Sequence, residues 1–190
     1  LDEEGITFDE PKLKIMGIEA VKSSTPEYCR KKIKESIKII MGKQEIDLHK
    51  FVKETKEEFL KLPAEAVSFP RSCNNMKKYY SSSDVFIKGT PIHVKGALIY
   101  NHQIKEFGLE KKYPLIQEGD KIKFVKLLEA NPFKFDVISY VSELPKEFKL
   151  KDYVDYELQF QKTFLDPITF ILQPIGWTPE PKASLEAFFG

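Results

Sequence analysis

Residues 23–43 read SSTPEYCRKKIKESIKIIMGK, and this stretch decides the fold because it predicts a long amphipathic helix. Ser24 or Thr25 stands where an N-cap belongs, Pro26 occupies the first turn, and Gly42 marks the end. The basic residues point largely away from the apolar ones, which gives the helix a basic outer face. The apolar stripe consists of Cys29, Ile33, Ile37 and Ile40.

The same apolar spacing recurs further along the chain. It predicts a second helix over residues 47–62, which forms an antiparallel hairpin with the first helix. A third helix is predicted to begin with Thr90 as its cap and Pro91 in its first turn, and to end at Gly108.

The remaining segments add a small β portion. Residues 66–86 predict a strand, a short helix and a loop, whereas residues 121–128 and 136–141 predict two antiparallel strands around a turn. Helical spacing resumes over residues 153–177, until Asp166-Pro167 is expected to break the helix or restart it with Asp166 as a cap. The predicted fold class is α+β, mostly helical, with an extended C-terminal tail.

Composition narrows the class of protein. The 190 residues are 42% hydrophobic, which suffices for a core, and no run approaches the ~20 apolar residues of a membrane span. The acidic start LDEEGITFDEP is unlike a signal sequence, so we expect a soluble, intracellular protein. Because no initiator Met is present, we expect a segment of a longer polypeptide, although a removed tag would leave the same trace.

Catalytic and metal-binding patterns are weak. Cys29 and Cys73 are expected to be reduced, and the three histidines do not take metal-ligand spacing with them. The chain has no DxD and no phosphate-binding GxxxxGK, and nothing selects an acid pair among its 29 Asp and Glu. A small enzyme with an unrecognised acid pair stays an alternative.

Charge is sorted along the chain although the net charge is only +1. Residues 11–43 hold nine Lys and Arg against three Glu, and residues 71–105 hold six against one Asp. Three segments there combine cations with small polar or aromatic residues, a mixture able to contact phosphates, sugars and minor-groove edges. The residues are Lys12, Lys14, Lys22, Ser23 and Ser24; Asn74, Asn75, Lys77 and Lys78; and His93, Lys95, Tyr100 and Asn101.

Each of these segments also has a structural interpretation. The first is compatible with a solvated charge run and a good helix cap, and the second with a helix N-cap followed by core tyrosines. His93 alone could be a core histidine with its hydrogen bonds satisfied.

The tail after Trp177 ends in KASLEAFFG. If this tail forms a helical turn, Leu185, Phe188 and Phe189 would share one face of it and fill a pocket on another protein or on this one.

Six segments, taken in order and spacing, carry a resemblance: KLKIMGIEAVKSSTP, SCNNMKKYY, PIHVKGALIYN, EANPF, LQFQKTFLDPI and KASLEAFF. From about Pro11 to Phe189 the chain resembles the C-terminal part of a family B DNA polymerase of the T-even bacteriophage type. The resemblance implies a last palm strand and palm–thumb junction over residues 1–23, a thumb over residues 24–177 and a clamp-binding tail over residues 178–190.

The resemblance further implies a thumb that grips primer-template duplex DNA through the thirteen residues named above, without reading sequence. It implies a tail that binds a sliding clamp, with Lys182 where many such tails have Gln. The tail residues concerned are Lys182, Ser184, Leu185, Phe188 and Phe189.

The family's catalytic carboxylates would lie upstream of Leu1, so the resemblance implies no catalytic residue, metal ligand or cofactor in this chain. The parent polymerase would use Mg²⁺ and deoxynucleoside triphosphates in the host cytoplasm. A freestanding clamp-binding adaptor without polymerase activity is the alternative, and an upstream reading frame with aspartate motifs would exclude it.

Overall fold

The computed structural model describes residues 22–182 and confirms the α+β class. The chain forms two compact units, each with its own core. Within the described residues, unit 1 consists of residues 22–61 and 160–182, and unit 2 of residues 62–159. The predicted palm, thumb and tail boundaries stay predictions.

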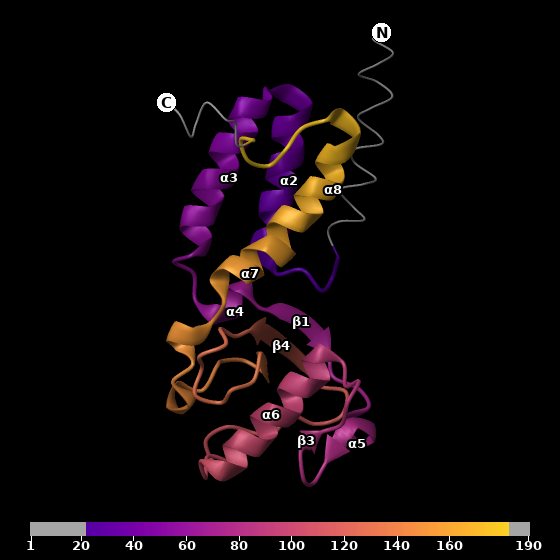
Figure 1. The fold of residues 1–190 in the computed structure, drawn as a ribbon, viewed down its shortest axis with the longest axis vertical. Coiled ribbons are helices and arrows are strands. Elements are labelled where there is room, and N and C mark those ends of the chain that lie inside the picture. Colours follow the sequence, from indigo (N-terminus) through magenta and orange to yellow (C-terminus); the bar gives the residue numbers. More distant parts are fainter. Residues whose placement is uncertain (1–21, 183–190) are drawn as a thin grey trace. The chain divides into compact units, whose positions relative to one another are not determined.

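Unit 1 begins with the predicted pair of helices, α2 (Glu27–Gly42) and α3 (Glu45–Phe59), which pack together (Figure 1). The start of α2 differs from the prediction, because Pro26 is the N-cap and no side chain caps the helix. Proline has no backbone N–H, and its φ of −56° with an extended ψ of 145° leads the chain into the first turn. A capping box begins α3, where Gln44 and Asp47 exchange hydrogen bonds.

The C-terminal helix of unit 1 contains a π turn. The π segment η3 (Gln161–Leu165) leads directly into α8 (Asp166–Leu172), and both contact α2. Figure 1 shows α8 beside α2. The backbone N–H of Asp166 donates to the Gln161 carbonyl, five residues back. This wider turn carries the helix past Pro167, so the expected break is wrong, as is Asp166 in the role of cap.

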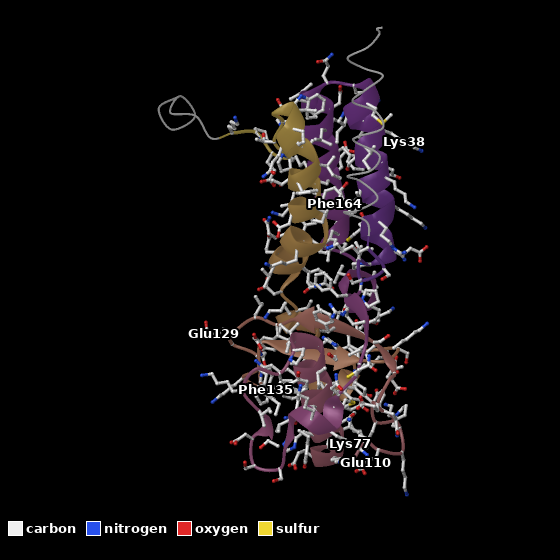
Figure 2. All side chains as sticks on the ribbon, turned by 90° about the vertical axis from the view of Figure 1, so that its right-hand side faces the viewer. Lys38, Lys77, Glu110, Glu129, Phe135 and Phe164 are labelled. Carbon is white, nitrogen blue, oxygen red and sulfur yellow. The ribbon has the colours of Figure 1, made fainter. Side chains whose placement is uncertain are left out.

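The core of unit 1 is aliphatic and aromatic. The Phe59 ring meets the Phe160 ring edge-on at 5.1 Å, and Phe164 is fully buried between helices, as Figure 2 shows. The residue directly after Trp177 is held to α3, because Thr178 N–H donates to the Glu45 carboxylate at 2.9 Å. The short 3-10 helix η4 (Gln173–Ile175) precedes this contact.

Unit 2 is built on a three-stranded antiparallel sheet in the order β1-β4-β5. The hairpin of β4 (Lys121–Lys126) and β5 (Val137–Tyr140) was predicted, whereas the pairing of β1 (Phe69–Ser72) with β4 was not. The helix α6 (Ile92–Glu106) packs on β5, whose four residues are all buried. As in α2, proline is the N-cap: Pro91 precedes the helix, while the Thr90 hydroxyl donates to the Ile87 carbonyl.

Short elements complete unit 2. The β4–β5 turn is ordered by the buried Asn131, whose amide donates to the carbonyls of Leu128 and Phe135 at 2.7 Å each. The small hairpin of β2 and β3 was not predicted. The elements are α4 (Ala64–Val67), α5 (Met76–Tyr79), β2 (Tyr80–Ser81), β3 (Val85–Phe86), η1 (Lys146–Phe148), η2 (Lys151–Tyr153) and α7 (Tyr156–Phe160), which ends where unit 1 resumes.

Within residues 22–182, no helix combines the length and the apolar character needed to span a membrane.

Candidate nucleic-acid interface

The basic segment Asn74–Lys78 of unit 2 is held by hydrogen bonds between the backbone just before it and a distant loop. Cys73 N–H donates to the Asp120 carbonyl at 2.8 Å, and Gly119 N–H donates to the Cys73 carbonyl at 2.6 Å. Asn75 has a φ of 65°, a left-handed conformation that Asn tolerates better than most residues. The buried Met76 then anchors the single turn of α5.

Glu118 completes this anchorage. Its carboxylate accepts hydrogen bonds from two successive backbone N–H groups, those of Asn75 and Met76, the latter at 2.9 Å. These groups stand at the start of α5, where an anionic acceptor is favourable. The segment is therefore held in one conformation by a loop that lies more than forty residues along the chain.

With the backbone fixed, the polar side chains of the segment face solvent. Asn74, Asn75, Lys77 and Lys78 are all exposed, and Figure 2 shows Lys77 at the outer surface of unit 2. The Lys78 ammonium lies over the Tyr79 ring, 5.2 Å from its centroid. Two cations and two amides are thus exposed together, and side chains of both kinds can contact a phosphodiester backbone.

Lys95 of α6 lies in a charge network instead of standing alone. Its ammonium is 2.8 Å from one Asp136 oxygen, and the Lys126 ammonium is 2.9 Å from the other. Burial raises the pKa of Asp136, but hydrogen bonds and charges from both lysines outweigh that effect and lower the pKa to about 2. Two cations share one anion, so the network keeps a net positive charge at neutral pH.

His93, also on α6, is buried beside Phe124, with the two ring centroids 6.2 Å apart. Burial and the nearby Arg71 charge lower the pKa of His93, although a hydrogen bond with the Ser72 backbone opposes them. The imidazole is therefore neutral at pH 7. The backbone carbonyl of His93 accepts a hydrogen bond from the Ser139 hydroxyl at 2.9 Å.

Tyr100 and Asn101 hold the loop that follows α6. Tyr100 is buried and donates through its hydroxyl to the Pro114 carbonyl at 3.3 Å. Asn101 exchanges two hydrogen bonds with the backbone of Ile116, at 2.9 and 2.8 Å. Both side chains thus have a structural role within unit 2, and their predicted contact with DNA stays a prediction.

The predicted junction residues lie only partly within the described range. Lys22 and Ser23 are exposed and Ser24 is half-buried, just before the first turn of α2, and Lys182 is exposed at the other end. Thr25 N–H closes a turn onto the Lys22 carbonyl at 2.9 Å. The predicted residues Lys12, Lys14, Ser184, Leu185, Phe188 and Phe189 lie outside the described residues.

The structure adds two acidic residues that sequence reasoning missed, Glu118 and Asp136. Glu118 lies more than forty residues from its partners, and only the turn-like sequence around Gly119 marks the loop that holds it. Asp136 lies ten residues from Lys126 across the predicted hairpin, but its contact with Lys95 joins it to a helix 41 residues away. Among residues 22–182, no cluster of three or more His, Cys, Asp or Glu side chains could hold a metal ion.

Comparison with known proteins relates this chain to phage DNA polymerases. None of the protein-family models matches the chain. The DNA-directed DNA polymerase of Enterobacteria phage T4 is 32% identical over 193 residues, covering 100% of this chain and 21% of the polymerase. That of Escherichia phage RB69 is 35% identical over 192 residues, covering 99% and 21%. The chain is therefore homologous over its whole length to a segment of these phage DNA-directed DNA polymerases, and it spans about a fifth of their length.

Proposed function

We propose that this chain is the thumb region of a replicative family B DNA polymerase, together with the last palm strand and a clamp-binding tail. In this proposal it grips the primer-template duplex behind the active site through phosphate and minor-groove contacts. The observation that carries the proposal is the match of the whole chain to one segment of two phage DNA polymerases. The catalytic carboxylates, Mg²⁺ and deoxynucleoside triphosphates belong to the rest of the polymerase.

The geometry of unit 2 supports a duplex grip. Lys77 and Lys78 are exposed on a segment whose backbone is held by Glu118, so little backbone freedom is lost when they meet a phosphate. Contacts of this kind give affinity without sequence preference, which a polymerase that copies any template requires.

A salt titration tests the role of the two lysines. Each phosphate contact contributes about 0.9 to the slope of log affinity against log salt on duplex DNA. Replacing Lys77 and Lys78 with Ala should therefore reduce the slope by about 2 and weaken binding equally for every duplex sequence. Fluorescence anisotropy of a labelled primer-template duplex at several salt concentrations measures both quantities.

The matched control replaces Lys105 and Lys111, two exposed lysines of unit 2 outside the segment, with Ala. This control removes the same amount of charge as the Lys77/Lys78 variant. If phosphate contacts made by the segment decide the slope, the control should leave the slope nearly unchanged, because its two lysines lie outside the segment. An unchanged slope in the Lys77/Lys78 variant would remove this segment from the interface.

We also propose that the tail tethers the chain to a sliding clamp, with Leu185, Phe188 and Phe189 filling a pocket of the clamp. The support is the spacing of these residues, which would place three apolar side chains on one face if this segment formed a helical turn. A tether of this kind raises the effective concentration of the polymerase at the primer end.

Replacing Phe188 and Phe189 with Ala should cost about 2 kcal/mol or more of clamp binding, as loss of a central aromatic anchor does, while DNA affinity stays unchanged. Isothermal titration calorimetry of the chain against its cognate clamp measures the first quantity, and duplex anisotropy measures the second. Clamp binding that survives both substitutions would exclude the tail from the interface. Clamp binding with no DNA binding at all would favour the adaptor alternative.

A further inference from the structure

The helix α2 carries a stripe of cations that its own acidic residues do not neutralise. Its two acidic residues are engaged: Glu27 lies 3.6 Å from Lys31, and Glu35 lies 3.4 Å from Lys32. Within the described part of the chain, the other three cations have no ion pair. These three residues, which we call the α2 stripe, are Arg30, Lys34 and Lys38.

The positions of the stripe residues align them on one face. They recur every four residues, so their Cα atoms follow one another at about 6 Å and the stripe extends over about 12 Å. The buried residues of α2 lie on a different side of the helix from the stripe. They are Cys29, Ile33, Ser36 and Ile40. Lys34 and Lys38 are exposed, and Figure 2 shows Lys38 pointing away from the helices of unit 1.

Arg30 adds an independent observation at one end of the stripe. Its Nε atom is enclosed by protein and has no hydrogen-bond partner within residues 22–182. An enclosed donor without an acceptor destabilises that conformation by about 1–3 kcal/mol. A rotation that turns the guanidinium toward solvent would relieve this cost, and an anion there would supply an acceptor for Nε.

From this geometry we propose that the α2 stripe binds the phosphodiester backbone of a nucleic-acid strand, as a second contact separate from the Asn74–Lys78 segment. Successive phosphates of one strand rise 3.4 Å along the duplex axis and lie farther apart than that in space, because they follow a helical path. Three cations at intervals of about 6 Å can therefore each contact a separate phosphate of one strand. A membrane surface fits less well, because electrostatic binding to lipid takes clusters of about four to eight cations. The stripe is on unit 1, whereas the proposed duplex grip is on unit 2, so either can fail alone.

The test compares two triple variants of the full chain. The stripe variant is Arg30→Gln, Lys34→Gln and Lys38→Gln. The control is Lys50→Gln, Lys53→Gln and Lys61→Gln, which removes three exposed lysines of unit 1 that do not belong to α2. Anisotropy is measured over a range of salt concentrations on a labelled 20-base-pair duplex and on a labelled 20-nucleotide single strand, both of mixed sequence.

The stripe variant should lose about 3 from the salt slope on the duplex, or about 2 on the single strand, while the control loses less than 1. Loss on the duplex alone identifies duplex DNA as the ligand, and loss on the single strand alone identifies unpaired DNA. Equal losses in stripe and control variants, or no loss on either probe, would overturn the proposal. If the triple variant does not fold, a double variant with Lys34→Gln and Lys38→Gln replaces it, because it leaves the partly buried Arg30 intact. The double variant should lose about 2 from the salt slope on the duplex.

The two DNA proposals are separated by combining the variants. If both surfaces bind the same duplex, slope losses from the stripe variant and from Lys77→Ala with Lys78→Ala should add. A loss in the stripe variant alone keeps this inference and removes the proposed grip. A loss in the lysine pair alone does the reverse.

Discussion

Gly96 shows how one residue sets the distance between α6 and the sheet of unit 2. A Cβ atom at this position would lie 2.8 Å from the Ser139 backbone nitrogen and 3.1 Å from the Ile138 carbonyl carbon. Backbone atoms of β5 cannot move aside as a side-chain end can, so only glycine permits this approach. The same contact brings Ser139 Oγ within 2.9 Å of the His93 carbonyl.

Gly96→Ala should therefore destabilise the protein by about 1–3 kcal/mol through overpacking, although alanine is the better helix former by about 1 kcal/mol. Urea denaturation followed by circular dichroism measures the change. Gly42→Ala is the matched control, because a Cβ there has no atom within 4 Å, and it should be neutral or slightly stabilising. Equal stability of the two variants would contradict this account of the α6–β5 contact.

Single residues also show where sequence reasoning reached its limit in the candidate site. Exposure of Lys77 and Lys78 could be predicted, because consecutive lysines rarely become buried. The internal bonds of Asn101 could not, since its partner Ile116 lies fifteen residues away in a loop without periodicity. The hydrogen-bonding capacity of an amide is visible in a sequence, but its partner is not.

At the scale of elements, Asp136 joins α6 to the β4–β5 hairpin by its two lysine contacts. Because the folded-state pKa of Asp136 is lowered from 3.8 to about 2, its contribution to stability is present above pH 4. That contribution is lost as the pH falls from about 4 to about 2. The carboxylate is 52% exposed, so each pair contributes at most about 1 kcal/mol.

Asp136→Asn should therefore lower the stability at pH 7, and the difference from the unsubstituted chain should shrink as the pH approaches 2. Urea denaturation at pH 7, 5, 4 and 3 follows that difference. The control is Asp152→Asn, at an exposed position of unit 2 that is not part of the Asp136 network. A stability difference that stays constant with pH would contradict the ion-pair assignment.

Most helices and the β4–β5 hairpin could be predicted from the sequence because their apolar periodicity is local. The errors fall at prolines: Pro26 and Pro91 are themselves N-caps, and Pro167 is accommodated by a π turn. The pairing of β1 with β4 was missed because it joins residues about fifty positions apart. Pairings of that range depend on the whole fold, which no local window contains.

At the scale of the whole molecule, we propose that this chain is a DNA-holding part of a polymerase, with basic surfaces on each of its two units. Homology covers the whole chain but only 21% of each relative, and we propose that DNA synthesis requires the rest of such a polymerase. The purified chain should not incorporate nucleotides.

The most direct test of the central claim is fluorescence anisotropy of a labelled primer-template duplex against the corresponding single strand, titrated with this chain at two salt concentrations. The account predicts binding that prefers the duplex, ignores its sequence and weakens steeply as salt increases, since it depends on phosphate contacts. No duplex binding at low salt, or binding that does not respond to salt, would contradict the claim that this chain grips DNA.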